Sequence, residues 1–155
     1  MAISTDMRIL VTGATGKVGQ HFIHRFLADD ARHGAVVRAL CHNRMLEEGP
    51  RLEVVRGSIA ERADVARAME GVTHVLHLAT CKETPEDVMD VTVKGLFWLL
   101  EACRHADDFA QFILIGGDAG VGHFVYPHPV PVTEMQSHSA YEGCYALSKV
   151  LEEVM

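Results

Sequence analysis

Residues 12–19, TGATGKVG, constrain this 155-residue chain more than any other segment. They follow a short apolar run at residues 8–11 and precede a pattern of apolar side chains at helical spacing. A strand that turns into a helix through glycines can bring backbone N–H groups against a pyrophosphate with no Cβ in the way. The segment therefore predicts a nucleotide-binding turn formed by Gly13, Gly16 and Gly19, with Thr15, Lys17 and Val18 beside them. The apolar stripe of the helix comprises Val18, Phe22, Ile23, Phe26 and Leu27.

The same spacing excludes a P-loop. Val11 stands where that motif requires glycine, and Val18 follows Lys17 where it requires Ser or Thr. Flavodoxin-like and phosphate-receiver domains stay open as a remote alternative, although neither needs this glycine pattern.

Strand and helix patterns alternate along the rest of the chain. Further strands are predicted at residues 35–41, 52–55, 74–79 and 112–115, and helices at 61–69, 85–104 and from about 141–145 to 155. Three prolines exclude a continuous helix or an interior strand from residues 118–138. The pattern predicts an α/β fold, a Rossmann-type doubly wound parallel sheet of about five strands.

Composition narrows the classes of partner and compartment. The chain has 14 Lys+Arg against 21 Asp+Glu, a net charge of −7, and no basic run, which argues against nucleic acid and anionic membranes as partners. No stretch approaches the roughly 20 apolar residues of a membrane helix, and the N-terminus lacks the pattern of a signal peptide. The four cysteines are scattered. We expect a cytoplasmic protein with reduced thiols.

The chain has ten histidines, which are possible metal ligands. The pairs His21/His24 and His74/His77 have i,i+3 spacing, but the second falls on a predicted strand, where alternation places the two on opposite faces. We predict no metal site.

Tyr145 and Lys149 are four positions apart and share one face of the last predicted helix. A nearby ammonium favours the phenolate and lowers the pKa of a tyrosine, which then can exchange a proton with a substrate hydroxyl. The alternative is an ordinary surface pair. Tyr141 competes as the tyrosine, but the residue four positions after it is Tyr145.

Four further segments carry a resemblance. Residues 77–80 (HLAT) look like an HLAA segment, and residues 145–149 (YALSK) match YxxSK. Residues 91–95 (VTVKG) look like NVxGT, with Thr92 at the Asn position. Residues 55–59 (VRGSI) look like VxGDL, with Ser58 at the Asp position. With the glycine turn, these segments resemble the short-chain dehydrogenase/reductase superfamily, in its extended branch, the NAD(P)-dependent epimerase/dehydratase family.

The resemblance implies roles for individual residues. Leu78, Ala79 and Thr80 would line the cofactor, Ser58 and Ile59 would lie at the adenine, and Tyr145 and Lys149 would be the catalytic pair, with Lys149 also bonding the nicotinamide ribose. It implies an oxidoreductase that transfers hydride at a hydroxyl or carbonyl carbon, of a nucleotide sugar or another polyol.

One family residue is missing. The Ser or Thr expected after the fifth strand aligns with Gly117, and residues 116–122 contain no hydroxyl. Asp118 could supply a polar group, or Thr133, Ser137 or Ser139 could return from the Pro-rich segment. The absence supports a second hypothesis, a non-catalytic NADP-binding sensor or regulatory module.

The second strand bears on the choice of cofactor. An acidic residue at its end would bond the ribose hydroxyls of NAD, but the chain reads LCHNR at residues 40–44 and has no carboxylate before Glu47. His42 and Arg44 could face a 2′-phosphate, which favours NADP over NAD. The alternative is that Arg44 is a solvated loop residue.

The resemblance also bears on domain organisation. Residues 1–155 are expected to form one NAD(P)-binding domain, truncated at its C-terminal end and lacking the substrate lobe. An uncovered fifth strand would favour a homo-oligomer.

Overall fold

The computed structural model describes residues 7–81, 84–128 and 130–155. They form two compact units. The sheet unit comprises residues 7–79 and Trp98–Ile115, and the helical unit comprises the described residues of Thr80–Phe97 and Gly116–Met155. Each unit is described by itself below.

The sheet unit holds five parallel strands in the order β3-β2-β1-β4-β5. The order reverses beside β1, so successive strands build outward in both directions, as the alternating sequence pattern predicts. Val11 of β1 pairs with Ala39 on one side and Leu76 on the other. The strands are β1 (Arg8–Thr12), β2 (Val36–Cys41), β3 (Leu52–Arg56), β4 (His74–His77) and β5 (Gln111–Leu114).

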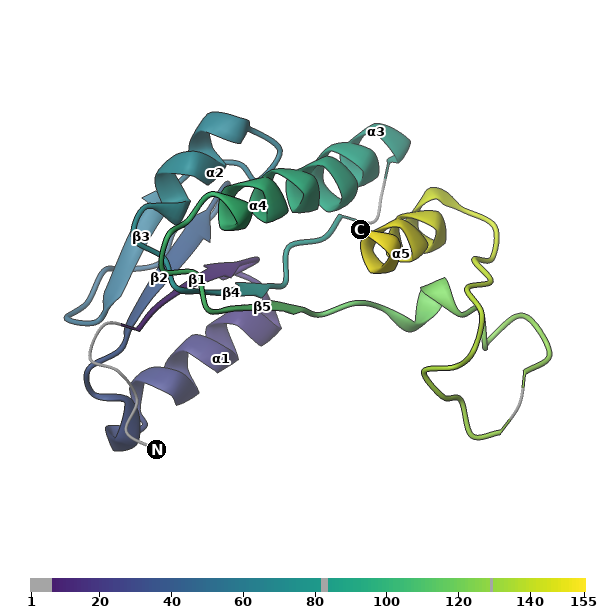
Figure 1. Cartoon of the computed structure of the whole chain (residues 1–155), viewed down its shortest axis with the longest axis horizontal. Coiled ribbons are helices and arrows are strands. Elements are labelled where there is room, and N and C mark those ends of the chain that lie inside the picture. Colours follow the sequence, from purple (N-terminus) through teal and green to yellow (C-terminus); the bar gives the residue numbers. More distant parts are fainter. Residues whose placement is uncertain (1–6, 82–83, 129) are drawn as a thin grey trace. The chain divides into compact units, whose positions relative to one another are not determined.

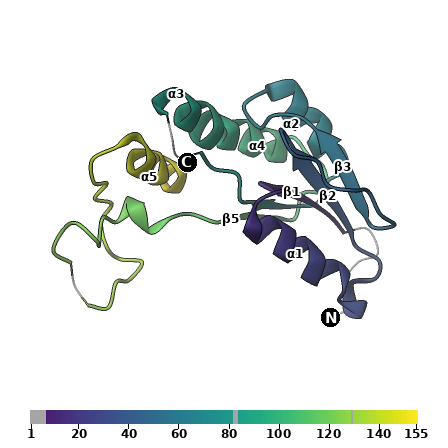
Figure 2. The same cartoon turned by 180° about the vertical axis from the view of Figure 1, so that it is seen from behind.

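Helices cover both faces of this sheet, which is why the central strands read as continuous apolar runs. Helix α1 (Lys17–Leu27) lies on one face, and α2 (Arg62–Met69) with the Trp98–Arg104 part of α4 lies on the other (Figures 1 and 2). The fold class is therefore confirmed. The core on the α1 side comprises Ile9, Val11, Ala14, Ile23, Phe26, Ala35, Val37, Ala39, Cys41 and Leu76.

Two details of the helices differ from expectation. Val18, expected in the apolar stripe of α1, is 65% exposed because it lies in the first turn, whereas Ile23 and Phe26 are buried. The helix expected over residues 85–104 is helical throughout but not uniformly α: it runs as α3 (Pro85–Asp87), the π-helical segment η2 (Val88–Lys94) and α4 (Gly95–Arg104). Within η2, Thr92 is buried and Val91 only partly so.

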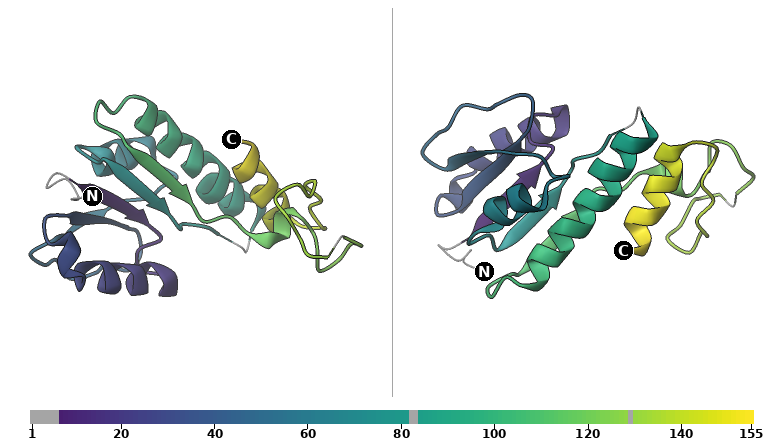
Figure 3. Two further views of the ribbon diagram at one scale, coloured as in Figure 1. Left: turned by 60° about the horizontal axis from the view of Figure 1, so that its bottom comes forward. Right: turned by 90° about the horizontal axis from the view of Figure 1, so that it is seen from above.

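The helical unit is built around α5 (Cys144–Val154), which lies alongside η2 (Figure 3, right). A 3₁₀ turn, η3 (Asp118–Gly120), also packs on α5. The buried side of α5 is unusually polar: Ser148, Lys149 and Glu152 are buried with Ala146. No helix in the described part of the chain is long and apolar enough to cross a bilayer.

Candidate functional site

The glycine turn lies between β1 and α1 and leaves no space for side chains. Gly13 has φ +65°, and a Cβ there would lie 2.8 Å from the backbone N of Ala79. A Cβ on Gly19 would lie 2.5 Å from the Gly13 carbonyl oxygen. The turn is closed by the Gly16 N–H, which donates to the Gly13 oxygen at 2.9 Å. Only glycine lets the chain pass this close to itself and keep α1 directly behind the turn.

The N-terminus of α1 is suited to an anion. Gly16 is its N-cap and makes no side-chain cap hydrogen bond, and the first turn of this fully described helix carries no acidic residue. Lys17 and Val18 are exposed there, and the Thr15 carbonyl accepts from Nε2 of Gln20 at 2.7 Å. An uncapped helix N-terminus beside a Cβ-free turn fits the pyrophosphate of a dinucleotide.

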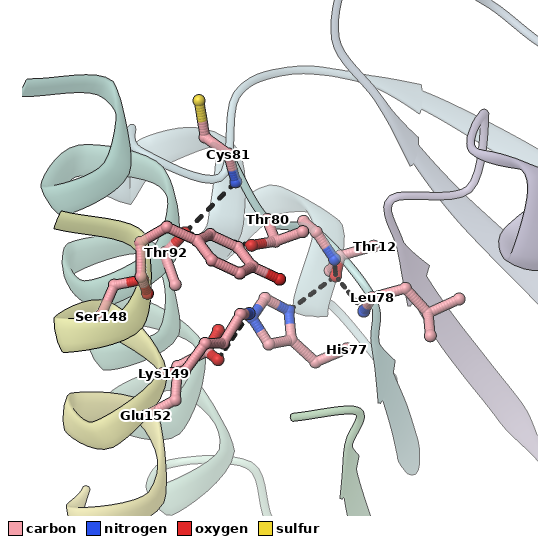
Figure 4. A network of polar contacts seen from close by, with 11 residues as sticks. Thr12, His77, Leu78, Thr80, Cys81, Thr92, Ser148, Lys149 and Glu152 are labelled. Atoms are coloured by element: carbon pink, nitrogen blue, oxygen red, sulfur yellow. Dashed lines mark hydrogen bonds and ion pairs between the residues drawn. The ribbon is translucent and has the colours of Figure 1, made fainter. Parts of the chain in front are cut away.

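Thr12 ties this turn to the end of β4, a role that the sequence interpretation missed. Its Oγ1 accepts from the N–H groups of Leu78 and Ala79, each at 3.2 Å, and lies 2.7 Å from Nδ1 of His77 (Figure 4). With both lone pairs used, the hydroxyl has its own proton left to donate to Nδ1. The N–H groups of Leu78 and Ala79 are thus engaged within the fold. The only sequence signal was that Thr12 opens the glycine motif.

The residues expected at the adenine end lie after β2 and β3. His42 and Arg44 are exposed, Ser58 is half-buried and Ile59 is buried. The Ser58 N–H donates to Oδ2 of Asp64 at 2.8 Å. That hydrogen bond and then Arg67, at 2.8 Å, hold the pKa of the Asp64 carboxyl below its usual value.

In the helical unit, Lys149 is paired with an acid. Its Nζ lies 2.7 Å from Oε2 of Glu152, and the two side chains are 3% and 1% exposed (Figure 4). The same Nζ lies 5.3 Å from the centroid of the Tyr145 ring. The predicted pair of Tyr145 and Lys149 is therefore brought together on α5, but Glu152 shares the lysine.

The expected lowering of the pKa of Tyr145 is wrong. Burial raises the pKa of Tyr145, and the charge of Glu152 and then of Tyr141 and Asp118 raise it further. The physical reason is first that burial disfavours the charged phenolate, and second that the negative charge of Glu152 lies nearby.

The position of the missing serine faces the lysine. A Cβ on Gly117 would lie 3.2 Å from Cδ of Lys149. Asp118 has a 60% exposed side chain that lies 3.8 Å from Nε2 of His123. Of the hydroxyl residues in the Pro-rich segment, Ser139 returns to this region through its backbone, because its N–H donates to the Gly120 carbonyl at 2.8 Å.

Two other motif residues make contacts within the helical unit. Thr92 lies 3.4 Å from Thr80, hydroxyl to hydroxyl, and accepts from the Cys81 N–H at 3.3 Å. Ser148 of the YxxSK segment is buried and donates to the Tyr145 carbonyl at 2.7 Å, which is a structural role within the helix. Among the residues described, no group of three or more His, Cys, Asp or Glu is arranged to hold a metal.

Comparison with known proteins identifies the family of the chain and several relatives. The model of the NAD dependent epimerase/dehydratase family matches residues 9–155. The chain is 26% identical to a bifunctional dihydroflavonol 4-reductase/flavanone 4-reductase of Malus domestica, over 97% of this chain and 49% of that protein. It is 25% identical to a UDP-glucose 4-epimerase of Rickettsia felis, over 75% of this chain and 38% of that protein. The chain thus spans about half the length, or less, of these curated relatives.

Solved structures agree on the fold. A short-chain dehydrogenase/reductase superfamily protein from Agrobacterium tumefaciens with bound NAD superposes with a TM-score of 0.79 at 28% identity, over 95% of this chain and 43% of that one. Uronate dehydrogenase from Agrobacterium tumefaciens superposes with a TM-score of 0.82 at 24% identity, over 96% and 53%. Since the family model spans nearly the whole chain, from the first strand to the last helix, this chain belongs to the NAD dependent epimerase/dehydratase family of the short-chain dehydrogenase/reductase superfamily.

Proposed function

We propose that residues 1–155 form the cofactor-binding part of an NAD(P)-dependent oxidoreductase of the epimerase/dehydratase type. The observation that carries this proposal is the turn at Gly13 and Gly19, where any Cβ would strike backbone atoms and where α1 begins uncapped. A turn without Cβ atoms lets a pyrophosphate approach the backbone N–H groups at the start of a helix.

In this proposal Gly13, Thr15, Gly16, Lys17, Val18 and Gly19 hold the pyrophosphate. Ser58 and Ile59 border the adenine, and Leu78, Ala79 and Thr80 line the path of the cofactor. Lys149 bonds the nicotinamide ribose, and Tyr145 exchanges a proton with the substrate oxygen. The bound nicotinamide supplies the hydride chemistry, and the side chains orient the substrate and move its proton.

The substrate would carry a secondary hydroxyl or a carbonyl, as in a nucleotide sugar or another polyol. A UDP-glucose 4-epimerase and a uronate dehydrogenase are among the similar proteins, and both names denote chemistry at sugar carbons. The Malus domestica relative is named as a dihydroflavonol and flavanone reductase. The compounds tested as substrates should therefore include carbonyl compounds other than sugars.

We propose NADP rather than NAD as the cofactor because of the residues that follow β2. His42 and Arg44 are exposed there, and both could face a 2′-phosphate. No carboxylate stands in this stretch before Glu47 to bond a free ribose hydroxyl.

The test is a fluorescence titration of the chain with NADPH and NADH. Val18→Asp places a negative charge at the exposed N-terminus of α1, where it is compatible with helix stability but repels a pyrophosphate. We expect it to weaken binding of both nucleotides about tenfold or more. His24→Asp, in the last turn of the same helix, is the matched control and should bind as the unmodified chain does. Equal affinity of the two variants, or no binding by the unmodified chain, would reject the proposal.

A further inference from the structure

The sheet unit contains a cavity that the proposed reaction does not use. Its volume is about 1050 Å³, close to the upper size of pockets that hold small ligands, about 1,000 Å³. It lies at the starts of β1, β2 and β4, beside the last turns of α2 and α4 (Figure 1). The glycine turn follows the opposite end of β1. The cavity is therefore separate from the proposed cofactor site, and the residues that line it all belong to the sheet unit.

Apolar side chains from four segments form much of the cavity wall. Met69 and Val72 are 5% and 2% exposed, and Val36 and Ala102 are half-buried. They come from α2, the turn after it, β2 and α4, so the packing of the sheet unit holds this wall in place. Such a wall favours a ligand with an apolar body, because binding removes apolar surface of both partners from water.

The charged side chains at the cavity are mostly acidic. Glu70, Asp107 and Asp108 line it and are exposed. Within the ranges that the structure describes, none of these three carboxylates is in an ion pair. Among the described residues that line the cavity, only Arg8 carries a permanent positive charge, and it lies 3.3 Å from Oε1 of Glu53.

Two histidines also line the cavity, and they leave it acidic. Burial lowers the pKa of His74, so this ring is uncharged at neutral pH, and its Nδ1 lies 2.7 Å from the Thr73 hydroxyl oxygen. His105 lies 3.9 Å from Oε2 of Glu101. Even with His105 protonated, the three carboxylates outnumber the positive charges of His105 and Arg8. Helices α2 and α4 both end here, and the C-terminal end of a helix adds partial negative charge.

We propose that this cavity binds a small organic cation, a primary amine that carries an aliphatic chain. The chain lies along the wall that Met69 and Val72 form, and the ammonium lies among the carboxylates of Glu70, Asp107 and Asp108. An apolar wall beside unpaired acids is complementary to a molecule that joins an apolar body to a positive charge. The inference goes beyond the proposed function, because this ligand is neither the cofactor nor the substrate.

The test compares hexylamine with hexanol and hexanoate, which share its chain length and differ in the head group. Two-dimensional NMR of the isotopically labelled, cofactor-free chain at neutral pH shows where each compound binds. We expect hexylamine to shift the backbone amide signals of Gly71, Thr73 and Ala106 and to leave those of Gly13 and Gly16 unchanged. Hexanol should bind about threefold more weakly or worse, and hexanoate should shift none of these signals. Equal binding of hexylamine and hexanoate, or no shift at the cavity, would overturn the inference.

Asp107→Asn/Asp108→Asn tests the role of the carboxylates with almost no change in size. We expect it to weaken hexylamine binding about threefold or more and to leave hexanol binding unchanged. Glu47→Gln/Glu48→Gln is the matched control, because it removes the same charge from two adjacent exposed acids that do not line the cavity. An equal effect of the two variants would mean that the amine is attracted to the acidic chain as a whole, and the inference would be wrong.

Ala66→Trp tests the cavity itself. Ala66 lines the cavity and is exposed on α2, so a larger side chain can enter the cavity without entering the core. We expect hexylamine and hexanol both to bind about tenfold more weakly or worse. Ala63→Trp is the control, since Ala63 is exposed on the same helix and does not line the cavity. Unchanged hexylamine binding in Ala66→Trp would refute the assignment of the site.

These measurements use no nucleotide, so they are separate from the test of the proposed function. A chain that binds hexylamine at the cavity but no NADPH or NADH would reject the proposed function alone. A chain that binds a nucleotide but gives no amide shift at the cavity would reject the amine site alone.

Discussion

Thr12 Oγ1 and His77 Nδ1 lie 2.7 Å apart although the two residues are 65 positions apart in the chain. The hydroxyl also accepts from two backbone N–H groups that follow β4, so one small side chain fixes the glycine turn against the neighbouring strand end. The turn is thereby held rigid before any ligand arrives, which lowers the entropic cost of binding one.

Thr12→Val is expected to lower the free energy of unfolding by about 2 kcal/mol or more, because it leaves buried polar groups without the hydroxyl. Urea unfolding followed by circular dichroism measures the loss. Thr15→Val, which changes the same side chain three residues later, should cost much less. If the two variants are equally stable, Thr12 is not the tie described here.

Gly13→Ala is expected to abolish nucleotide binding, because the new Cβ would lie 2.8 Å from backbone atoms of Leu78 and Ala79 at a positive φ. The left-handed conformation alone costs about 1–2 kcal/mol for a residue with a Cβ. Gly49→Ala is the control, since its Cβ would meet nothing closer than 4.0 Å. Calorimetric titration with NADPH distinguishes the two, and retained affinity in Gly13→Ala would contradict the turn's proposed role.

Arg44→Ala tests the preference for NADP. Losing one charge-assisted hydrogen bond to a phosphate is expected to weaken NADPH binding about tenfold and leave NADH binding unchanged. Arg25→Ala, an exposed arginine on α1, serves as the control. Tighter binding of NADH than of NADPH by the unmodified chain, with no effect of Arg44→Ala, would show that NAD is the cofactor.

Gly117→Ser places a hydroxyl at the position where the resemblance to the family leads us to expect one. Removing such a donor costs roughly 100- to 1,000-fold in rate, so adding it is expected to raise any turnover by up to about 100-fold. The flexible Lys149 side chain must yield slightly, since it lies 3.2 Å from the new Cβ. Gly116→Ser, with more room, is the control. Nicotinamide absorbance measures turnover, and a fall in Gly117→Ser alone would count against the assigned position.

Replacing the buried ion pair by apolar side chains, Lys149→Met/Glu152→Leu, is expected to leave stability unchanged or raise it by about 1–4 kcal/mol. Lys149→Met alone should cost about 3–5 kcal/mol, because it leaves the Glu152 carboxylate buried without its partner. Because the folded pKa of Glu152 is raised, its contribution to stability is fully present below the unfolded value of about 4.3 and is lost as pH rises through the folded pKa. The advantage of the double variant should therefore grow as the pH rises above about 4.3.

Urea unfolding at several pH values measures this difference. Lys94→Met/Asp90→Leu makes the same change at an exposed ion pair and controls for the gain in apolar side chains. A double variant as unstable as Lys149→Met, at every pH, would contradict the account.

The alternation of strands and helices and the glycine turn were predictable because both follow from local rules: apolar runs that alternate with helical spacing, and glycines set three apart. The contacts that adjust the site were not. The Thr12–His77 bond joins distant strand ends, and only packing decides that Glu152, rather than its exposed neighbour Glu153, points at Lys149. The pKa of Tyr145 was predicted in the wrong direction for the same reason, since YxxSK identifies the lysine but neither the burial of the tyrosine nor the nearby Glu152.

The outermost strand has a practical consequence. β5 is the last strand of the described sheet, and Ile113 and the following Ile115 are 42% and 52% exposed. A strand that carries bare isoleucines at the margin of a sheet can pair with another copy of itself. Purified at high concentration, this chain should therefore sediment as more than one oligomeric species. The Ile113→Lys variant should sediment as a single species.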